Sequence, residues 1–433
     1  MENLALKMQE RLPAELIGFL RIAGKEAEAR GQRLYLVGGA VRDLLLGRPN
    51  LDFDLVVEGD ALALARWLAK GEGIGGENEK SGERVTVHRK FGTVKFSRGS
   101  LNIDLVTARS ETYAKPGALP TVQPGTIRDD LLRRDFSINA MAIDLSPGSF
   151  GRLLDPHSGR SDLEQGRIIR ILHERSFIDD ATRILRALRY EQRLGFKLEQ
   201  NTERLLRKHK SMLDTISGDR VRHELELILK EERPEQTLER AQALGVLQQL
   251  HPSLRGNGWL AERFGEARRK AIADPALYLL LLVYHLSEEA IERFISRLKI
   301  VGELGRNMRQ VPRLKGELPA LADHALPPSS IYRLLKHYPP GPIAACALAS
   351  DSPIVRTHLE LYINQLRYVK IFLDGEDLKR LGVKPGPRLG RVLETIREAK
   401  LDGQVSTRKD EEALTRQLLG ESEKGRGKIG GDL

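Results

Sequence analysis

The sequence predicts an α+β protein in which a mixed β-sheet comes first and an all-helical remainder follows. Short apolar runs, each of strand length and separated by glycine-containing turns, recur between residues 34 and 145. After Ile171 this signal stops, and apolar residues recur at the three- and four-residue spacing of amphipathic helices. We therefore expect the sheet within residues 31–176 and helices beyond it.

Composition limits the class of protein and its partners. The 433 residues are enough for two to four domains, and Lys and Arg outnumber Asp and Glu by 70 to 60, which favours a polyanionic partner. The single cysteine, Cys346, leaves no intramolecular disulfide and no Cys-based zinc site, as is typical of a cytoplasmic protein. The longest apolar run, Pro275–Leu286, is too short to span a membrane. We expect a cytoplasmic, nucleic-acid-binding protein with no membrane role.

The stretch Leu34–Asp60 combines the features of a phosphate site and a metal site. A predicted strand ends at Gly38-Gly39, and a predicted helix follows, whose free N-terminal N–H groups favour an anion. The next predicted strand carries Asp52 and Asp54, which are two residues apart and so point to the same face. Such paired carboxylates, together with substrate phosphates, are the usual ligands of Mg²⁺. Either feature alone is common as a plain turn or a solvated acidic pair, but their combination in one unit predicts a site.

Three further strands are predicted at Val85–His88, Thr93–Phe96 and Leu101–Val106, after a Gly- and Glu-rich surface loop at 71–82. Asp104 stands among apolar residues in the last of these strands, where a buried carboxylate needs a partner. It is either a third metal ligand or a strand residue that faces solvent.

The motifs Gly38-Gly39-Ala40-Val41-Arg42-Asp43 and Asp52-Phe53-Asp54 resemble the signature of the class II tRNA nucleotidyltransferases, relatives of bacterial poly(A) polymerase in the polymerase β superfamily. The resemblance implies a polymerase-β-like nucleotidyltransferase head with a five-stranded sheet, followed by a helical neck, body and tail. It also implies transfer of nucleotides from CTP and ATP to a tRNA 3′ end, with two Mg²⁺ ions held by Asp52, Asp54 and Asp104 as catalytic and metal-binding residues.

Two segments between the strands and the helices extend the resemblance. Arg133–Ala140 matches the family's second motif, in which Arg134 can donate to phosphate and Asp135 can accept from a ribose hydroxyl, which would select NTP over dNTP. Ser110–Thr126 holds three prolines and two glycines and is predicted to be a loop. In the family, a flexible loop at this place is linked to addition of the terminal A.

The helix predicted within Phe177–Phe196 carries a candidate for base recognition. Asp180 and Arg183 are three residues apart, so we expect them to be neighbours on one helix face, which Arg186 continues. An Asp accepts from an exocyclic amine and an Arg donates to ring nitrogens, so the pair can imitate a base edge, although a simple intrahelical salt bridge explains the same spacing. The resemblance implies that Asp180 and Arg183 form a protein template for the incoming nucleotide. Asp179 departs from the family, which usually has Glu there.

The predicted domains are an N-terminal helix at 1–30, the catalytic head at 31–176, a nucleotide-selecting neck at 177–232, a tRNA-binding body and tail at 233–419, and a disordered C-terminus at 420–433. The predicted nucleotide-binding residues are Gly38, Gly39, Arg42, Arg134, Asp135, Asn139, Asp180, Arg183, Arg186 and Arg189.

The function that these motifs imply is the addition of CMP and AMP to the 3′ end of tRNA, which makes or repairs the CCA end. The open alternatives are an enzyme that adds only CC or only A, a poly(A) polymerase, and an RNA-binding protein with a catalytically silent head. The intact Asp52-Phe53-Asp54 motif favours the enzyme, because a silent head has no need of a costly acidic cluster.

Overall fold

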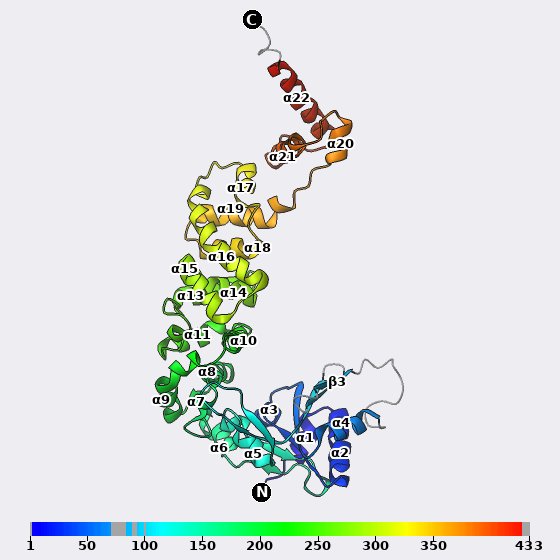
Figure 1. Ribbon diagram of the computed structural model, residues 1–433, viewed down its shortest axis with the longest axis vertical. Helices are drawn as coiled ribbons and strands as arrows, with labels where there is room; N and C mark the ends of the chain where they lie inside the picture. The colour runs from blue at the N-terminus through cyan, green and yellow to red at the C-terminus, as the bar shows by residue number, and fades with distance from the viewer. Residues whose placement is uncertain (1, 71–83, 89–92, 99–100, 427–433) are drawn as a thin grey trace. The chain divides into compact units, whose positions relative to one another are not determined.

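The computed structural model describes residues 2–70, 84–88, 93–98 and 101–426, so the loop predicted at 71–82 lies outside the described residues (Figure 1). The chain forms two compact units, Met1–Leu250 and His251–Leu433. The finer division into head, neck, body and tail stays a prediction.

The N-terminal segment forms two helices, α1 (Ala5–Arg11) and α2 (Ala14–Ala29), where one helix was expected. The break falls at Leu12-Pro13, and Leu12 has an extended backbone with ψ of 149°. A residue before proline is pushed out of the helical region, and proline is well placed just before a new helix. Pro13 is therefore the reason that the single-helix prediction is wrong.

The first unit is built on a seven-stranded sheet in the order β3-β4-β5-β2-β1-β8-β9. β2 and β5 run parallel, whereas the other neighbours in the sheet are antiparallel, so the predicted mixed sheet is confirmed. The family-based expectation of five strands is wrong because β8 and β9 extend the sheet beyond β1. The strands are β1 (Arg33–Val37), β2 (Asp52–Glu58), β3 (Arg84–His88), β4 (Thr93–Arg98), β5 (Leu101–Thr107), β8 (Ala142–Asp144) and β9 (Leu153–Leu154).

The two faces of the sheet have different neighbours. Helices α2 and α4 (Ala61–Lys70) pack on one face, where Phe19 of α2 lies 6.2 Å from Phe96 of β4, ring centre to ring centre. Helix α5 (Ile127–Leu132) packs on the other face, against Tyr35 and Val56. Because side chains alternate along a strand, Asp54 lies on the same face as Val56. The acidic residues thus project from the face opposite α2 and α4.

The segment predicted as a loop at Ser110–Thr126 is a β-hairpin instead. β6 (Arg109–Thr112) pairs antiparallel with β7 (Thr121–Pro124). Its prolines avoid the strand interiors: Pro116 and Pro120 lie in the connection, and Pro124 ends β7. At these places proline removes no interior ladder hydrogen bond, so its presence does not prevent strand pairing.

The rest of the first unit is helical apart from one short exception. A two-residue strand, β11 (Lys197–Leu198), pairs with β10 (Ile168–Ile169), so the expectation that strands end at Ile171 fails at this place. The helices of this unit that remain are α3 (Gly39–Leu46), α6 (Gly159–Ser161), α7 (Ser176–Asp179), α8 (Thr182–Leu194), α9 (Gln200–His209), α10 (Gly218–Leu229), α11 (Pro234–Ala243) and α12 (Leu247–Leu250).

Helices form the described part of the second unit. They are α13 (Gly258–Arg269), α14 (Pro275–Leu282), α15 (Glu288–Leu298), α16 (Gly302–Glu317), α17 (Pro328–Leu335), α18 (Pro340–Ala349), α19 (Pro353–Asn364), α20 (Gly375–Arg380), α21 (Pro387–Leu401) and α22 (Arg408–Arg426). Because α22 continues to Arg426, the disorder expected from residue 420 is wrong for 420–426, and residues 427–433 lie outside the described part. Among the described residues, none of the helices is both long enough and apolar enough to cross a membrane.

Candidate active site

The three predicted acids lie on adjacent strands. Asp52 and Asp54 occupy exposed positions of β2. Phe53, Leu55 and Val57 point to the opposite face of the sheet and are buried in the core. In the parallel pairing of β2 with β5, Asp54 stands directly opposite Asp104. Partners in a ladder point to the same face. The structure therefore brings Asp52, Asp54 and Asp104 to one face, as predicted.

The neighbours of these acids differ in charge. The Asp104 carboxylate forms an ion pair of 3.0 Å with Lys95 of β4, and Asp52 Oδ1 accepts a 3.1 Å hydrogen bond from the Asn102 side chain. Asp54 is an exposed residue of β2, but the surrounding protein removes much of the hydration of its carboxylate. This desolvation raises the pKa of Asp54, the Arg134 guanidinium opposes the rise, and the Asp104 and Asp52 charges add to it.

These acids fit a divalent oxygen-binding cation. Asp104 and Asp52 both raise the pKa of Asp54, which is the mark of like charges held together. Among the residues that the structure describes, no three His, Cys, Asp or Glu side chains converge closely enough to enclose a metal by themselves. Mg²⁺ commonly takes only one or two carboxylates and completes its coordination with water and substrate phosphates. An incomplete cluster of carboxylates therefore suits Mg²⁺ better than a metal that requires a closed protein site.

Gly38 shapes the turn beside the acids. It precedes α3 with a φ of +72°, a conformation that favours glycine. A Cβ atom at Gly38 would lie 2.5 Å from Arg134 Nη1 and 3.6 Å from Asp54 Oδ2. Because Gly38 has no side chain, the Arg134 guanidinium and the Asp54 carboxylate can approach the turn. At its other end, α3 stops at Gly47, which has a φ of +67°, as predicted. Gly38, directly before α3, thus lies beside a cationic and an anionic group at once.

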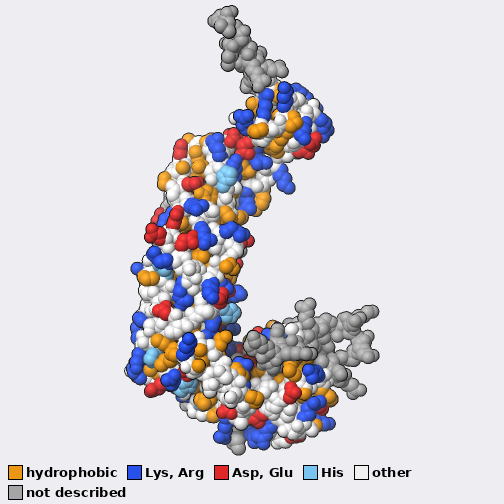
Figure 2. Space-filling model, viewed as in Figure 1, with side chains coloured by type: hydrophobic (Ala, Val, Ile, Leu, Met, Phe, Trp, Pro, Cys, Tyr) orange, Lys and Arg blue, Asp and Glu red, His pale blue; other side chains and the backbone are white. Residues whose placement is uncertain are grey.

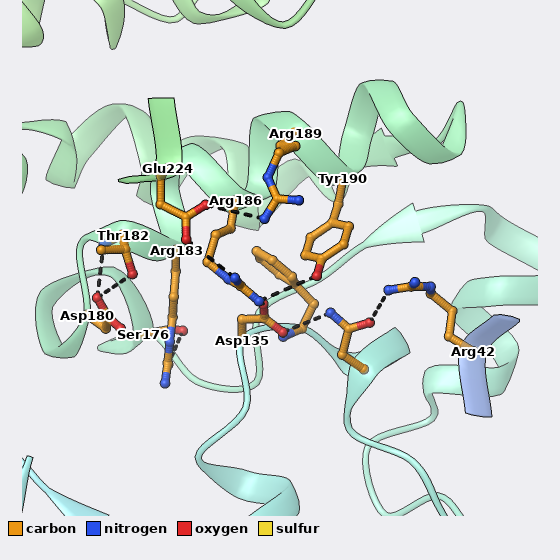
Figure 3. Close-up of polar contacts among 12 residues, drawn as sticks. Arg42, Asp135, Ser176, Asp180, Thr182, Arg183, Arg186, Arg189, Tyr190 and Glu224 are labelled. Carbon is orange, nitrogen blue, oxygen red and sulfur yellow. Dashed lines mark hydrogen bonds and ion pairs between the residues drawn. The ribbon is translucent and has the colours of Figure 1, made fainter. Parts of the chain in front are cut away.

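Asp135 has every acceptor position of its carboxylate in use. Its Oδ1 accepts from Phe136 N and Asn139 Nδ2, both at 2.9 Å, and its Oδ2 accepts from Nε and Nη2 of Arg186 at 2.9 and 2.7 Å (Figure 3). Burial acts to raise the pKa of Asp135, but Arg186 and the Asn139 hydrogen bond outweigh it and lower the pKa. A carboxylate has about four lone-pair positions. The predicted bond to a ribose hydroxyl therefore requires one of these four bonds to open.

A network of arginines surrounds the Tyr190 ring. The guanidinium carbons of Arg42, Arg186 and Arg189 lie 5.3, 5.5 and 5.1 Å from the ring centre. Arg42 donates to Asn139 Oδ1 at 2.7 Å, and its other nitrogens hold Asp43. These distances are those of cation–π contacts. Asn139, Arg42, Arg186 and Arg189 are thereby brought into one cluster.

Sequence reasoning missed two members of this cluster, Tyr190 and Glu224. Glu224 of α10 pairs with Arg186 at 3.4 Å and with Arg189 at 3.3 Å (Figure 3). The spacing of Arg186, Arg189 and Tyr190 within one helix could have pointed to Tyr190. No local signal could have found Glu224, because it comes from a helix 35 residues further along the chain from Arg189.

The expectation that Asp180 and Arg183 share one helix face is wrong. Asp180 precedes α8 with an extended backbone, φ −139° and ψ 100°, and its Oδ1 accepts from Thr182 N at 3.0 Å and Thr182 Oγ1 at 2.7 Å (Figure 3). An Asp side chain commonly holds the free N–H groups at a helix start, and this competes with a place inside the helix. Asp180 also pairs with Arg220 at 2.7 Å.

Arg183 is inside α8, buried, and directed to other partners. It donates to Ser176 Oγ at 2.7 Å and to the carbonyl oxygen of Arg133 at 2.5 Å. Asp179, the departure from the family pattern, has its Oδ1 3.6 Å from Arg175 Nη2. Asp180 and Arg183 are three residues apart, yet each is held by a different group of neighbours.

Two family models match the chain. Residues 34–169 match the poly A polymerase head domain, and residues 195–256 match the probable RNA and SrmB-binding site of polymerase A. The first range contains the acidic strands, and the second begins directly after α8.

Curated relatives and solved structures match much more of the chain. An A-adding tRNA nucleotidyltransferase of Geobacter sulfurreducens is 35% identical over 93% of this chain, which spans only about half (47%) of that relative. An A-adding tRNA nucleotidyltransferase of Halalkalibacterium halodurans is 33% identical, with 96% of each chain covered. The apo structure of a CCA-adding enzyme has a TM-score of 0.81 and 32% identity over 97% of this chain and 99% of its own. Other matching structures are CCA-adding enzymes described as complexed with CTP, with ATP and, in Thermotoga maritima, with tRNA. The chain therefore belongs to the tRNA nucleotidyltransferase family.

Proposed function

We propose that this protein adds nucleotides from CTP and ATP to the 3′ end of tRNA and that it completes the whole CCA end. The single observation that supports nucleotidyl transfer best is the placement of Asp52, Asp54 and Asp104 on one face beside the Gly38 turn. The relatives whose names include tRNA nucleotidyltransferase, and the matching structures with CTP, ATP and tRNA, support these substrates.

In this proposal Asp52 and Asp54 would hold Mg²⁺, and Asp104 would supply a third carboxylate. Mg²⁺ at such a place supplies charge neutralisation for the triphosphate and lowers the pKa of the attacking hydroxyl. Gly38 and Gly39 let the triphosphate approach the start of α3, and Arg134 donates to a phosphate oxygen. Asp135 orients Arg186 and Asn139, while Arg42 and Arg189 complete the nucleotide-binding cluster around Tyr190.

Addition of A alone is a second candidate, because the two relatives reported above are A-adding enzymes. The hairpin β6–β7 is compatible with both candidates. It occupies the place at which the family has the loop linked to terminal A addition.

The test offers tRNAs that end before CCA, after C and after CC, with CTP and ATP separately and together, and sequences the products. We expect a complete CCA end on all three substrates. Activity on the CC-ended tRNA alone would identify an A-adding enzyme, and a stop at CC would identify a CC-adding enzyme. Indefinite A tails on unrelated RNAs would identify a poly(A) polymerase, and no incorporation would favour an RNA-binding protein.

The tRNA itself is proposed to contact the helices beyond the head. On the face drawn in Figure 2, Lys and Arg side chains of the second unit are interspersed with acidic and apolar side chains rather than gathered in one patch. Exposed basic residues on and between α20 and α21 include Lys379, Arg380, Lys384 and Arg391. Phosphate contacts by such residues make binding depend strongly on salt.

Replacing Gly38 by Ala is expected to raise the KM for ATP by about tenfold or more. A tenfold loss of affinity for ATP corresponds to only about 1.4 kcal/mol of binding free energy. The added Cβ is strained at a φ of +72° and displaces the Arg134 guanidinium, which would lie 2.5 Å away. Steady-state kinetics measure the change. Gly148→Ala is the matched control, because nothing lies within 4 Å of a Cβ there and its activity should be retained. An unchanged KM in Gly38→Ala would remove this turn from the nucleotide site.

Replacing Asp180 or Arg183 by Ala is expected to damage the choice of nucleotide more than the rate of chemistry, because the acids on β2 and β5 are untouched. Sequencing of products made with all four NTPs should show more U and G. Arg222→Ala is a control on α10, since Arg222 pairs with Asp219 on the helix surface. If both Asp180→Ala and Arg183→Ala lose rate and keep the selectivity for C and A, these residues are structural and the template assignment fails.

A further inference from the structure

A lysine stands beside the three acids of the site. Lys95 of β4 is paired with Asp104 of β5 in an antiparallel ladder, and Asp104 is paired with Asp54 of β2 in a parallel one. Partners in a ladder point to the same face of the sheet. Lys95, Asp104 and Asp54 therefore form one row across three adjacent strands. This row puts an ammonium group directly beside the proposed metal ligands.

The Lys95 ammonium group holds the third acid. Lys95 Nζ lies 3.0 Å from Asp104 Oδ2, and the two side chains are 54% and 31% exposed. Because β5 lies between β4 and β2, Lys95 approaches Asp104 from the side opposite Asp54. Within the ranges that the structure describes, no three acidic side chains come close enough together to hold a metal. The ion pair thus engages the third carboxylate on the outer side of the cluster.

This ion pair competes with a divalent cation. A cation bound by Asp104 would share one carboxylate with the Lys95 ammonium, and two positive charges on one carboxylate repel each other. Lys95 is readily displaced, because an exposed ion pair contributes little to stability and lysine has a flexible, strongly hydrated side chain. Arg134, another cation near the acids, is anchored by Asp130 at 3.0 Å and is only 15% exposed. Lys95 is therefore released more easily than Arg134.

We propose that Lys95 is a positioning residue that competes with the divalent cation for Asp104 and so sets the metal concentration at which the site fills. The inference rests on the part of the proposed function that makes Asp104 the third metal ligand. On metal binding, the Lys95 ammonium moves into solvent and the Asp104 carboxylate turns towards Asp52 and Asp54. Without a metal, the same ammonium offsets part of the repulsion among the three acids.

A metal titration of the full chain, without nucleotide or tRNA, tests the competition. Mn²⁺ is the probe, because it takes the same oxygen ligands as Mg²⁺ and its free form is measured by electron paramagnetic resonance. Lys95→Met keeps the length of the side chain and removes its charge, so we expect Mn²⁺ to bind about tenfold more tightly. Lys95→Arg keeps the charge and should bind Mn²⁺ as the wild type does. Unchanged affinity in Lys95→Met, or no measurable Mn²⁺ binding by either protein, would overturn the proposal.

A double-mutant cycle shows whether Lys95 acts through Asp104. Asp104→Asn alone should weaken Mn²⁺ binding, and in that background Lys95→Met should change the affinity by less than about threefold. A gain of about tenfold in both backgrounds would mean general charge repulsion and would contradict the proposal. Lys25→Met is the matched control, because Lys25 is an exposed residue of α2, which packs on the opposite face of the sheet. Its Mn²⁺ affinity should equal that of the wild type, and circular dichroism and Tm establish that each variant is folded.

Activity separates this inference from the proposed function. The Mg²⁺ concentration for half-maximal addition of AMP to a CC-ended tRNA, at saturating ATP, should be lower in Lys95→Met than in the wild type. A wild type that shows the expected Lys95 dependence of Mn²⁺ binding but adds no nucleotide would refute the proposed function and support the competition. A wild type that adds nucleotides, with the same Mg²⁺ requirement in Lys95→Met, would refute the competition alone.

Discussion

Asp54→Asn is expected to reduce the rate of nucleotide addition by about a thousandfold or more, because it removes a proposed ligand of Mg²⁺. A bound metal ion stabilises the charge of a transition state by several kcal/mol. The substitution removes one carboxylate charge and keeps the size of the side chain, so the strand and its core are preserved. Single-turnover incorporation of AMP into a CC-ended tRNA measures the loss. Asp52→Asn should behave similarly, because both residues occupy exposed positions on the same face of β2.

The same variant should be more thermally stable than the wild type when Mg²⁺ is absent. Asp54 is desolvated and is repelled by Asp104 and Asp52, so removing its charge relieves an unfavourable interaction. Added Mg²⁺ should raise the Tm of the wild type and have less effect on Asp54→Asn, because a ligand stabilises the state that binds it. Asp60→Asn is the control: Asp60 follows β2 and caps α4 through Leu62 N and Ala63 N. Near-normal addition by Asp54→Asn would refute the metal assignment.

Asp135→Ala is expected to lower the free energy of unfolding by about 3 kcal/mol, the low end of the cost of breaking a buried ion pair. The low end applies because Arg186 is 30% exposed and keeps Glu224 as a second partner. The ratio of kcat/KM for ATP to that for dATP should also fall, since Arg186 and Asn139 lose the carboxylate that positions them. Chemical denaturation measures stability, and steady-state kinetics measure selectivity.

Asp144→Ala is the control for this substitution. Asp144 is also a buried carboxylate, paired with Arg152 at 2.8 Å, but it lies on β8 outside the arginine cluster. It should lose stability and keep the ATP-to-dATP ratio. If Asp135→Ala is destabilised with an unchanged ratio, Asp135 is structural only.

The stability difference between wild type and Asp135→Asn should depend on pH. The pKa of Asp135 in the folded protein lies below its ordinary value of 3.8, so the ionised carboxylate stabilises the folded state. This contribution is fully present above the ordinary value and is lost as the pH falls through the lowered pKa. The wild type should therefore exceed Asp135→Asn in Tm at neutral pH, and the difference should shrink below about pH 4. A difference that stays constant across this range would contradict the ion pair.

Features that depend on neighbouring residues in the sequence were predicted well. The strand with Asp52 and Asp54, the helix that ends at Gly47, and the strand with Asp104 all follow from side-chain period and glycine position, which are local properties. Errors arose where a local rule had two outcomes. Prolines in 110–126 indicated a loop, but they fall in the turn and at the strand end of a hairpin. Asp180 fitted a helix face, but it precedes α8 and its carboxylate accepts from Thr182 N instead.

The sequence by itself determined the order of sheet and helices, the Gly38 turn and the two carboxylates on one strand face, because each depends on the chain within a few residues. The tertiary structure alone decided how Asp135, Arg186, Glu224 and Tyr190 combine. Asp135 and Glu224 come from segments far from α8 in the sequence. Their geometry depends on packing between distant segments, which side-chain periodicity does not encode.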